Sequence, residues 1–332
     1  MLLFQDRWLP TFVLLGIVVG SATCSKGVGP AAAGSRYMGQ SPPGETLTIF
    51  APGLVSTSDA VELNGVFSPD LREFFFTRMT RVPSGDRVFR MYRSVASDDG
   101  SWSAPEQVPV YPDNAPSLAV DMAYSPDGRR LYFLGRHPHP LSPDNPGSDI
   151  WVSERTSEGH WSLAVPVPPP VWTEESESYP SFAPDGTLQF SSRRPGGFGE
   201  SDLWRAPLLG DGEFGTPVNL SEIVNSEYTE GDSCVAPDGS YIVLTSGRPG
   251  GYGNGDLYVS FRDPCTGAWN GPVNLGGQIN SGNTDYCPMI TPDGRFLFFS
   301  RRVSDPIDSG WEGVTAGDVY WVDTKVIERF RE

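Results

Sequence analysis

The residues best suited to chemistry are carboxylates that recur at one position of an internal repeat. Each stands eight residues before the aspartate of a Pro-Asp pair, and the five copies of this position hold Glu62, Ala119, Glu177, Glu230 and Asp285. In the copy with Ala119, Asp121 follows two residues later. Carboxylates gathered around one opening could bind a cationic, sugar or peptide ligand, and a suitably spaced pair could hydrolyse a glycoside.

Arginines recur at a second position, after the second strand of each repeat. They are Arg78, Arg136, Arg193 and Arg194, Arg248, and Arg301 and Arg302. A guanidinium group grips a carboxylate through two parallel hydrogen bonds, so one interpretation is that the arginines hold the carboxylates in structural pairs. Repetition in every unit favours this interpretation, because catalytic sites are usually asymmetric.

The other interpretation is that part of the ring faces an open channel and binds a ligand. Trp311 would join it, because this residue stands in a long irregular loop on the same face. The candidate ligand-binding residues at the channel mouth are then Glu62, Asp121, Glu177, Glu230, Asp285, Arg78, Arg136, Arg194, Arg248, Arg302 and Trp311.

The elements that must position these residues follow from a repeat of about 55 residues, whose Pro-Asp pairs begin at Pro69, Pro126, Pro184, Pro237 and Pro292. In each copy an apolar strand enters a turn with Pro second, Asp third and usually Gly fourth, which is typical of a type I turn. A second apolar strand, a loop that is often Gly-rich and an Asp that usually opens a third strand follow. The fourth strand carries proline, which a sheet tolerates at its edge.

Four strands with the last at an edge make one blade of a β-propeller. The fifth copy lacks a fourth strand, whereas residues 47–57 precede the first copy as a strand would. We therefore predict an all-β fold, a β-propeller of five four-stranded blades with the ring closed by the N-terminal strand. A ring of six blades is the alternative.

Composition agrees with this fold and limits the partners. The 332 residues include 38 Gly and 32 Pro, which disfavour helices and suit tight turns. The net charge of −17, without a run of Lys or Arg, argues against nucleic-acid binding.

The N-terminal residues predict export. Residues 1–24 have the pattern of a signal peptide, because the apolar run from Trp8 to Gly20 is too short to span a bilayer. Residues 25–46 are predicted as a flexible Gly/Pro/Ala/Ser tether and residues 47–332 as a single propeller domain. The S-A-T-C stretch resembles a bacterial lipoprotein signal, which implies lipidation at Cys24 and peripheral membrane attachment. We expect a monomer in the periplasm or at the cell surface.

Cysteines and histidines give weaker signals. With Cys24, Cys234, Cys265 and Cys287 the chain has too few cysteines for a disulfide scaffold, and a bridge between Cys234 and Cys287 is left open. His137 and His139 lack a matching carboxylate spacing for a metal site. We predict no catalytic residue, no metal site and no cofactor.

The S-P-D-G turn, the R-P-G-G-x-G loop and the D-[LIV]-[WY] strand together resemble the WD40-like Pro-Asp repeats of TolB-type β-propellers. The resemblance covers about residues 47–332. It implies a propeller of the bacterial cell envelope that binds proteins or peptides without doing chemistry. The six-bladed ring usual for TolB is not matched.

Two functions are compatible with these features. We favour an exported, non-enzymatic binding or scaffold propeller that recognises a protein, peptide or cell-envelope component at its channel-mouth face. The alternative is a glycoside hydrolase-like enzyme that uses the channel carboxylates, with Glu177, Glu230 and Asp285 as the acid and base.

Overall fold

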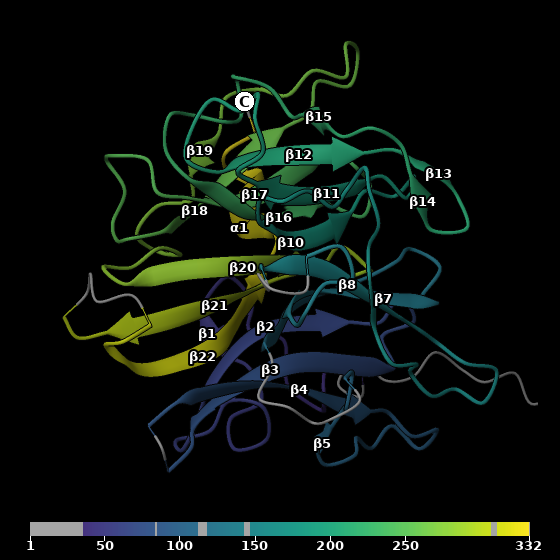
Figure 1. Ribbon diagram of the computed structural model, residues 1–332. Coiled ribbons are helices and arrows are strands. Elements are labelled where there is room, and N and C mark those ends of the chain that lie inside the picture. The colour runs from purple at the N-terminus through teal and green to yellow at the C-terminus, as the bar shows by residue number, and fades with distance from the viewer. Residues whose placement is uncertain (1–35, 84, 112–117, 143–146, 307–310, 332) are drawn as a thin grey trace, which may run out of the picture. The chain divides into compact units, whose positions relative to one another are not determined.

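The computed structural model describes residues 36–83, 85–111, 118–142, 147–306 and 311–331, and these form a five-bladed β-propeller. Each blade is a four-stranded antiparallel sheet, as the repeat predicted, and the inner strands of successive blades contact one another around a ring (Figure 1). The six-bladed alternative is therefore wrong. Because every copy of the repeat carries the same order of strands and turns, each one folds into the same kind of sheet.

The strands are given from the innermost to the outermost of each blade. Blade 1 contains β2 (Val61–Phe67), β3 (Glu73–Arg81), β4 (Arg87–Val95) and β5 (Glu106–Gln107). Blade 2 contains β6 (Leu118–Tyr124), β7 (Arg130–Arg136), β8 (Asp149–Glu154) and β9 (Val165–Pro166). Blade 3 contains β10 (Glu177–Phe182), β11 (Leu188–Ser192), β12 (Asp202–Ala206) and β15 (Val218–Asn219). Blade 4 contains β16 (Glu230–Val235), β17 (Tyr241–Ser246), β18 (Asp256–Phe261) and β19 (Val273–Asn274). Blade 5 contains β20 (Thr284–Ile290), β21 (Phe296–Ser304), β22 (Val314–Asp323) and β1 (Thr48–Ile49).

The Pro-Asp turns join the first and second strands of every blade. In the last four blades the fourth turn residue is a glycine with φ between 70° and 83°, and its N–H donates to the carbonyl three residues back. Glycine adopts this left-handed backbone without a steric cost. In blade 1 the same place holds Leu71, at φ 60°.

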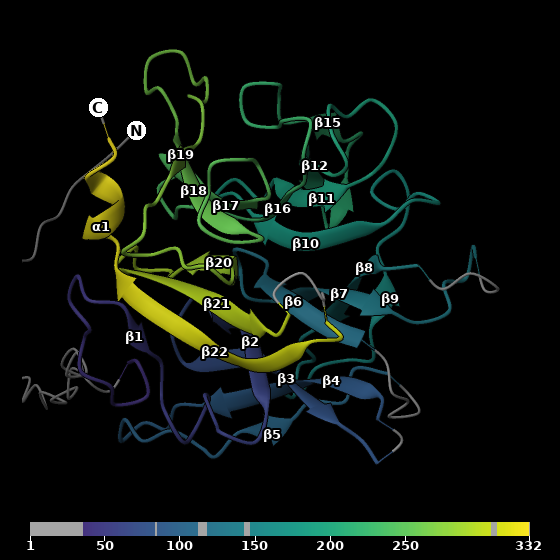
Figure 2. The same ribbon diagram turned by 90° about the vertical axis from the view of Figure 1, so that its left-hand side faces the viewer.

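The N-terminal strand closes the ring by completing blade 5. Thr48 and Ile49 of β1 pair with Trp321 and Tyr320 of β22, so the two ends of the propeller share one sheet (Figure 2). This pairing confirms the predicted closure, and it covers the edge that the unpartnered third strand would otherwise expose.

Part of the segment predicted as a flexible tether packs on the propeller. Tyr37 is fully buried, with its ring centroid 4.9 Å from that of Phe296. Its hydroxyl donates a 2.5 Å hydrogen bond to Asp293 of the fifth Pro-Asp turn. The tether interpretation overlooked that one aromatic residue in a Gly-rich stretch can bury enough apolar surface to hold the chain. Residues 1–24, including Cys24, lie outside the described residues.

The rest of the described chain adds little regular structure. A two-stranded ribbon, β13 (Leu208–Gly210) with β14 (Glu213–Phe214), extends from blade 3, and the helix α1 (Lys325–Glu328) follows β22. Within the described ranges, no helix has the length and apolar character needed to cross a membrane.

Candidate functional site

The recurring carboxylates form buried ion pairs with arginines in four of the five blades. The pairs are Glu62 with Arg78 at 2.9 Å, Glu177 with Arg194 at 3.1 Å, Glu230 with Arg248 at 3.0 Å, and Asp285 with Arg301 at 2.6 Å. The carboxylate side chains are at most 1% exposed. We call each pair, with the groups that hydrogen-bond to it, a latch.

Each latch ties the connection between blades to the blade that follows. In blade 4, Ser226 donates to Glu230 through both its N–H and its hydroxyl, each at 2.6 Å. Arg248 then donates to the carbonyl of Val224 at 2.8 Å and lies over the ring of Tyr258. Thr57, Thr173 and Ser281 bind the carboxylates of the other latches in the same way.

Burial controls the electrostatics of the latches. Removal from water raises the pKa of Glu62, Glu177 and Asp285, while their hydrogen bonds and arginine partners oppose the rise. Each oxygen of the four latch carboxylates accepts a hydrogen bond from a protein group, so none of these oxygens is left for a ligand. The latches therefore match the structural interpretation, and Glu177, Glu230 and Asp285 do not form an open acid and base pair.

Among the described residues of blade 2 there is no latch, and an aromatic side chain occupies the place. Ala119 pairs in register with Gly135, and a Cβ on Gly135 would lie 2.1 Å from the hydroxyl of Tyr111. Tyr111 is buried and packs against Trp151. Arg136, which the sequence aligned with the latch arginines, is exposed and donates to the hydroxyl of Ser148 at 3.1 Å.

Two further candidates lie in local packing rather than in an open site. Arg302 stands one residue beyond the latch arginine of blade 5, and its guanidinium lies 4.6 Å from the ring centre of Trp311. Trp311 in turn packs edge-on against Phe89, with 5.0 Å between ring centroids. The sequence left partner contact and loop packing open for Trp311, and the structure places it against its own chain.

Two residues beyond the latch position, every inner strand carries a β-bulge with a left-handed residue that is not glycine. These five residues form what we call the bulge ring: Asn64 (φ 50°), Asp121 (φ 56°), Tyr179 (φ 54°), Asp232 (φ 45°) and Cys287 (φ 52°). A side chain with a Cβ rarely adopts this backbone, and such residues are concentrated at functional sites.

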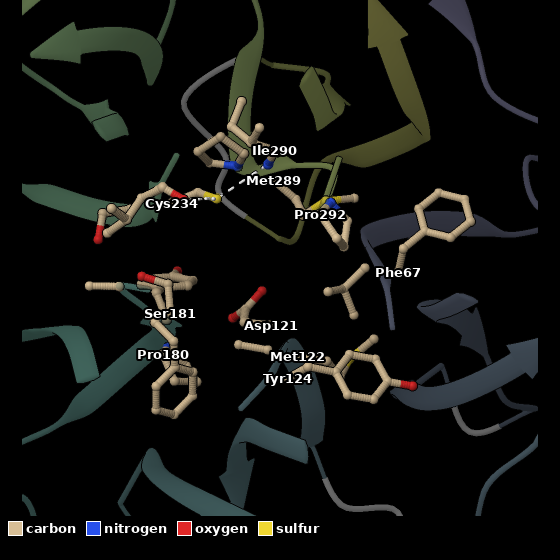
Figure 3. A pocket seen from close by; sticks show the side chains of 18 of the residues that line it. Phe67, Asp121, Met122, Tyr124, Pro180, Ser181, Cys234, Met289, Ile290 and Pro292 are labelled. Carbon is tan, nitrogen blue, oxygen red and sulfur yellow. Dashed lines mark hydrogen bonds between the residues drawn. The ribbon is translucent and has the colours of Figure 1, made fainter. Parts of the chain in front are cut away.

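The bulge ring lies at one end of a cavity of about 390 Å³ in the centre of the propeller. The other end is lined by the prolines of all five Pro-Asp turns, so the cavity lies toward the turn face and away from the latches. Apolar side chains also line the cavity, among them Val66. Figure 3 shows four others, Phe67, Met122, Tyr124 and Met289. A cavity of this size and lining is typical of small-ligand sites.

The two carboxylates of the bulge ring meet at Cys287. The Cys287 thiol donates to Asp121 Oδ1 and the Cys287 N–H donates to Asp232 Oδ2, both at 3.1 Å. Burial raises the pKa of Asp121 well above its usual value, and the neighbouring Asp232 carboxylate adds to the effect. Burial also raises the pKa of Asp232, to about 7.

Two polar atoms beside this pair lack partners. Within the described part of the chain, neither Asp232 Oδ1 nor the Ser181 hydroxyl forms a hydrogen bond, and both atoms are buried. Both residues line the cavity. Unpaired buried acceptors are costly, so these atoms point to a missing hydrogen-bond donor at this end of the cavity.

Of the candidates from the sequence, Asp121 alone lines this cavity. Asn64, Tyr179, Asp232 and Cys287 were missed as site residues. The signal was available, because all of them stand six residues before the aspartate of a Pro-Asp pair, at the same place as Asp121. The sequence-based prediction selected the latch position, where an acidic residue repeats. The cavity is lined instead by the position two residues later, where the residue type varies.

The described cysteines form no disulfide, and His139 belongs to local packing. Cys234, Cys265 and Cys287 are free thiols, so the bridge that the sequence left open between Cys234 and Cys287 is absent from the described structure. His139 stacks on Trp172 with 4.4 Å between ring centroids, and burial lowers its pKa. No cluster of three metal-ligating side chains occurs in the ranges that the structure covers.

Comparison with known proteins gives likeness in fold. No protein-family model and no curated protein matches the chain. An α-L-arabinofuranosidase from Podospora anserina, solved with cellotriose, aligns at TM-score 0.51 and 12% identity over 85% of this chain and 97% of that one. A TolB-assigned protein from Agrobacterium tumefaciens aligns at TM-score 0.46 and 16% identity over 73% of this chain and 70% of that one.

A TolB from Acinetobacter baumannii aligns at TM-score 0.43 and 16% identity over 80% of this chain. The alignment covers 54% of that TolB, so this chain spans about half of its length. At such identities the likenesses concern the β-propeller fold alone.

Proposed function

We propose that the protein is a non-enzymatic binding propeller that holds its ligand in the central cavity. The observation that carries this proposal is the contrast between the latches, whose carboxylates are fully bonded, and the cavity, which ends in unpaired acceptors. The ligand enters from the Pro-Asp turn face. It is a small molecule, or the terminal group of a protein, peptide or cell-envelope partner.

Filling the cavity tests this proposal. Ser181→Phe places a ring beside the bulge ring, and Ser157→Phe puts the same ring on an exposed turn of blade 2. We expect the neutral dye N-phenyl-1-naphthylamine to gain fluorescence on binding the purified chain. Ser181→Phe should weaken dye binding at least tenfold, and Ser157→Phe should leave it unchanged. Equal dye binding by both variants, or none by the wild type, would overturn the proposal.

Export and anchoring complete the proposal. The signal pattern of residues 1–24, the small-residue character of the segment after it and the S-A-T-C stretch support an exported protein attached through lipidated Cys24. Expressed in a bacterial host, the wild-type chain should enter the membrane fraction, and Cys24→Ala should release it. An unaltered membrane fraction would refute lipidation.

Glycoside hydrolysis is the second candidate, now with different residues. Asp121 and Asp232 line one cavity and both have raised pKa values, a combination that can supply a general acid and a base. If this enzyme exists, a panel of aryl glycosides will include one that the wild type cleaves and that Asp121→Asn and Asp232→Asn cleave at least a hundredfold more slowly. Absence of release across the panel would dismiss this candidate.

A further inference from the structure

The charge of the cavity restricts what can bind there. Of the described residues that line it, only Asp121 and Asp232 carry carboxyl groups, and the described lining contains no Lys, Arg or His. An anionic ligand would face two carboxyl groups without a compensating cation in the lining. The nearby Arg302, which lowers the pKa of Asp232, is held over Tyr286 and Trp311 outside the lining. The site is therefore built for a neutral or a cationic group.

The distribution of polar atoms favours the cation. Apolar side chains and prolines form most of the wall, and the hydroxyl of Tyr124 already donates to Glu73 at 2.9 Å. A sugar would bring hydroxyl groups against this wall and leave them without partners, which costs free energy. Acceptors gather instead at one end, where Asp121 projects into the middle of the cavity (Figure 3).

An ammonium group suits this end of the cavity. It carries three N–H donors and no acceptor. The cavity lining includes Asp121, together with Asp232 and Ser181, each of which has a buried oxygen atom without a hydrogen-bond partner. Asp232 and Ser181 are 7% and 8% exposed, so an opposite charge here acts with little competition from water.

We propose that the cavity binds a primary ammonium group carried on an apolar body. The ammonium lies at Asp121 and Asp232, and the apolar body lies against Val66, Phe67 and Met289. This inference rests on the proposed function, because it names the ligand class of the same cavity.

Proton release accompanies this binding. At pH 6 the Asp232 carboxyl, whose pKa burial raises to about 7, is mostly protonated, and a cation binds its ionised form. The amine itself stays protonated up to about pH 10. Affinity should therefore rise about tenfold from pH 6 to pH 8. The titratable or charged groups that face Asp232 from the packed strands are Asp121, Tyr179, Tyr286, Cys287 and Arg302.

Isothermal titration calorimetry of the purified full chain tests the proposal with two matched probes, 3-phenylpropan-1-amine and the neutral 3-phenylpropan-1-ol. We expect the amine to bind at least tenfold more tightly than the alcohol at pH 8. Asp232→Asn should remove most of this preference and leave alcohol binding intact. Asp211→Asn is the control, because Asp211 has a similar φ of 48° on an exposed turn.

The outcomes separate the two proposals. Equal affinity for amine and alcohol would overturn the ammonium site and leave the apolar cavity as a ligand site. Binding of neither probe would overturn both. An amine preference that survives in Asp232→Asn and in Asp121→Asn would place the cation elsewhere and overturn the inference. Calcium that binds at the same carboxylates and excludes the amine would overturn it as well.

Discussion

The latch position and the bulge position lie two residues apart on every inner strand, yet their side chains differ in variety and in bonding. The latch position holds Glu or Asp in four blades, and each carboxylate is bonded to an arginine and a Ser or Thr. The bulge position holds Asn, Asp, Tyr, Asp and Cys, and one of its carboxylate oxygens is unpaired. The position that repeats therefore serves the fold of four blades, and the position that varies lines the cavity that the blades share.

Breaking a latch should have the largest effect on stability. Arg194→Met leaves Glu177 buried without its cation, and removing one partner of a buried ion pair typically costs about 3–5 kcal/mol. We expect the free energy of unfolding in urea to fall by about that amount. Arg193→Met is the matched control, because Arg193 is the exposed neighbour.

Arg193→Met should change the free energy of unfolding by less than about 0.5 kcal/mol, as exposed substitutions usually do. If Arg194→Met were equally mild, the latches would not be structural, and their carboxylates would return as candidates for a ligand site.

Asp232→Asn should act in the opposite direction. The folded-state pKa of Asp232 is raised from 3.8 to about 7, so the protonated form favours folding and stability is lost as the pH rises through this window. Above pH 7 the wild type holds a buried charge that the variant lacks. At about 1.4 kcal/mol per pKa unit, the variant should be more stable at pH 8 by on the order of 4 kcal/mol.

Urea unfolding at pH 5 and pH 8 checks this difference, which should shrink at the lower pH. If replacing Asp232 stabilises the protein but weakens amine binding, Asp232 is a functional residue, because its buried charge lowers the stability of the fold and serves ligand binding instead. If Asp232→Asn were less stable than the wild type at pH 8, Asp232 would have a structural role like that of the latch carboxylates.

Asn64→Ala tests whether one member of the bulge ring serves the fold rather than the ligand site. Asn64 Oδ1 accepts a 2.5 Å hydrogen bond from the Met122 N–H of the next blade, so this member of the ring supports the fold. Its loss leaves a buried donor unpaired and puts alanine at φ 50°, which together should cost about 2 kcal/mol. Asn64→Gly removes the bond without the strain, and in thermal unfolding it should fall between the wild type and Asn64→Ala.

The sequence was sufficient to predict the blades but not to predict the cavity, and the reason is physical. Strands, Pro-Asp turns and closure by residues 47–57 follow from local patterns that repeat, so self-comparison finds them. The side of the ring on which the cavity lies depends on where five bulges turn their side chains. No glycine stands at the left-handed positions themselves, because Asn64, Asp121, Tyr179, Asp232 and Cys287 take this backbone with side chains in place.

The sequence also could not predict which residues pair when they lie far apart along the chain. Both Arg301 and Arg302 fit the repeat, and only the register of β20 with β21 sets Asp285 opposite Arg301. Burial of Tyr37 depends on contacts with blades 1 and 5 that no window of the N-terminal segment contains.

Tyr111→Phe should have the smallest effect and tests whether blade 2 replaces its latch by packing alone. The Tyr111 hydroxyl lies 3.5 Å from the Leu118 carbonyl, which is long for a hydrogen bond, whereas its ring fills the space beside Gly135. We expect the free energy of unfolding to change by less than about 0.5 kcal/mol, and Tyr111→Ala to cost about 3–5 kcal/mol through the cavity that it leaves. If Tyr111→Phe were as damaging as Arg194→Met, the hydroxyl would take the part of a latch. Blade 2 would then rely on a buried hydrogen bond from Tyr111 where the other four blades rely on an ion pair.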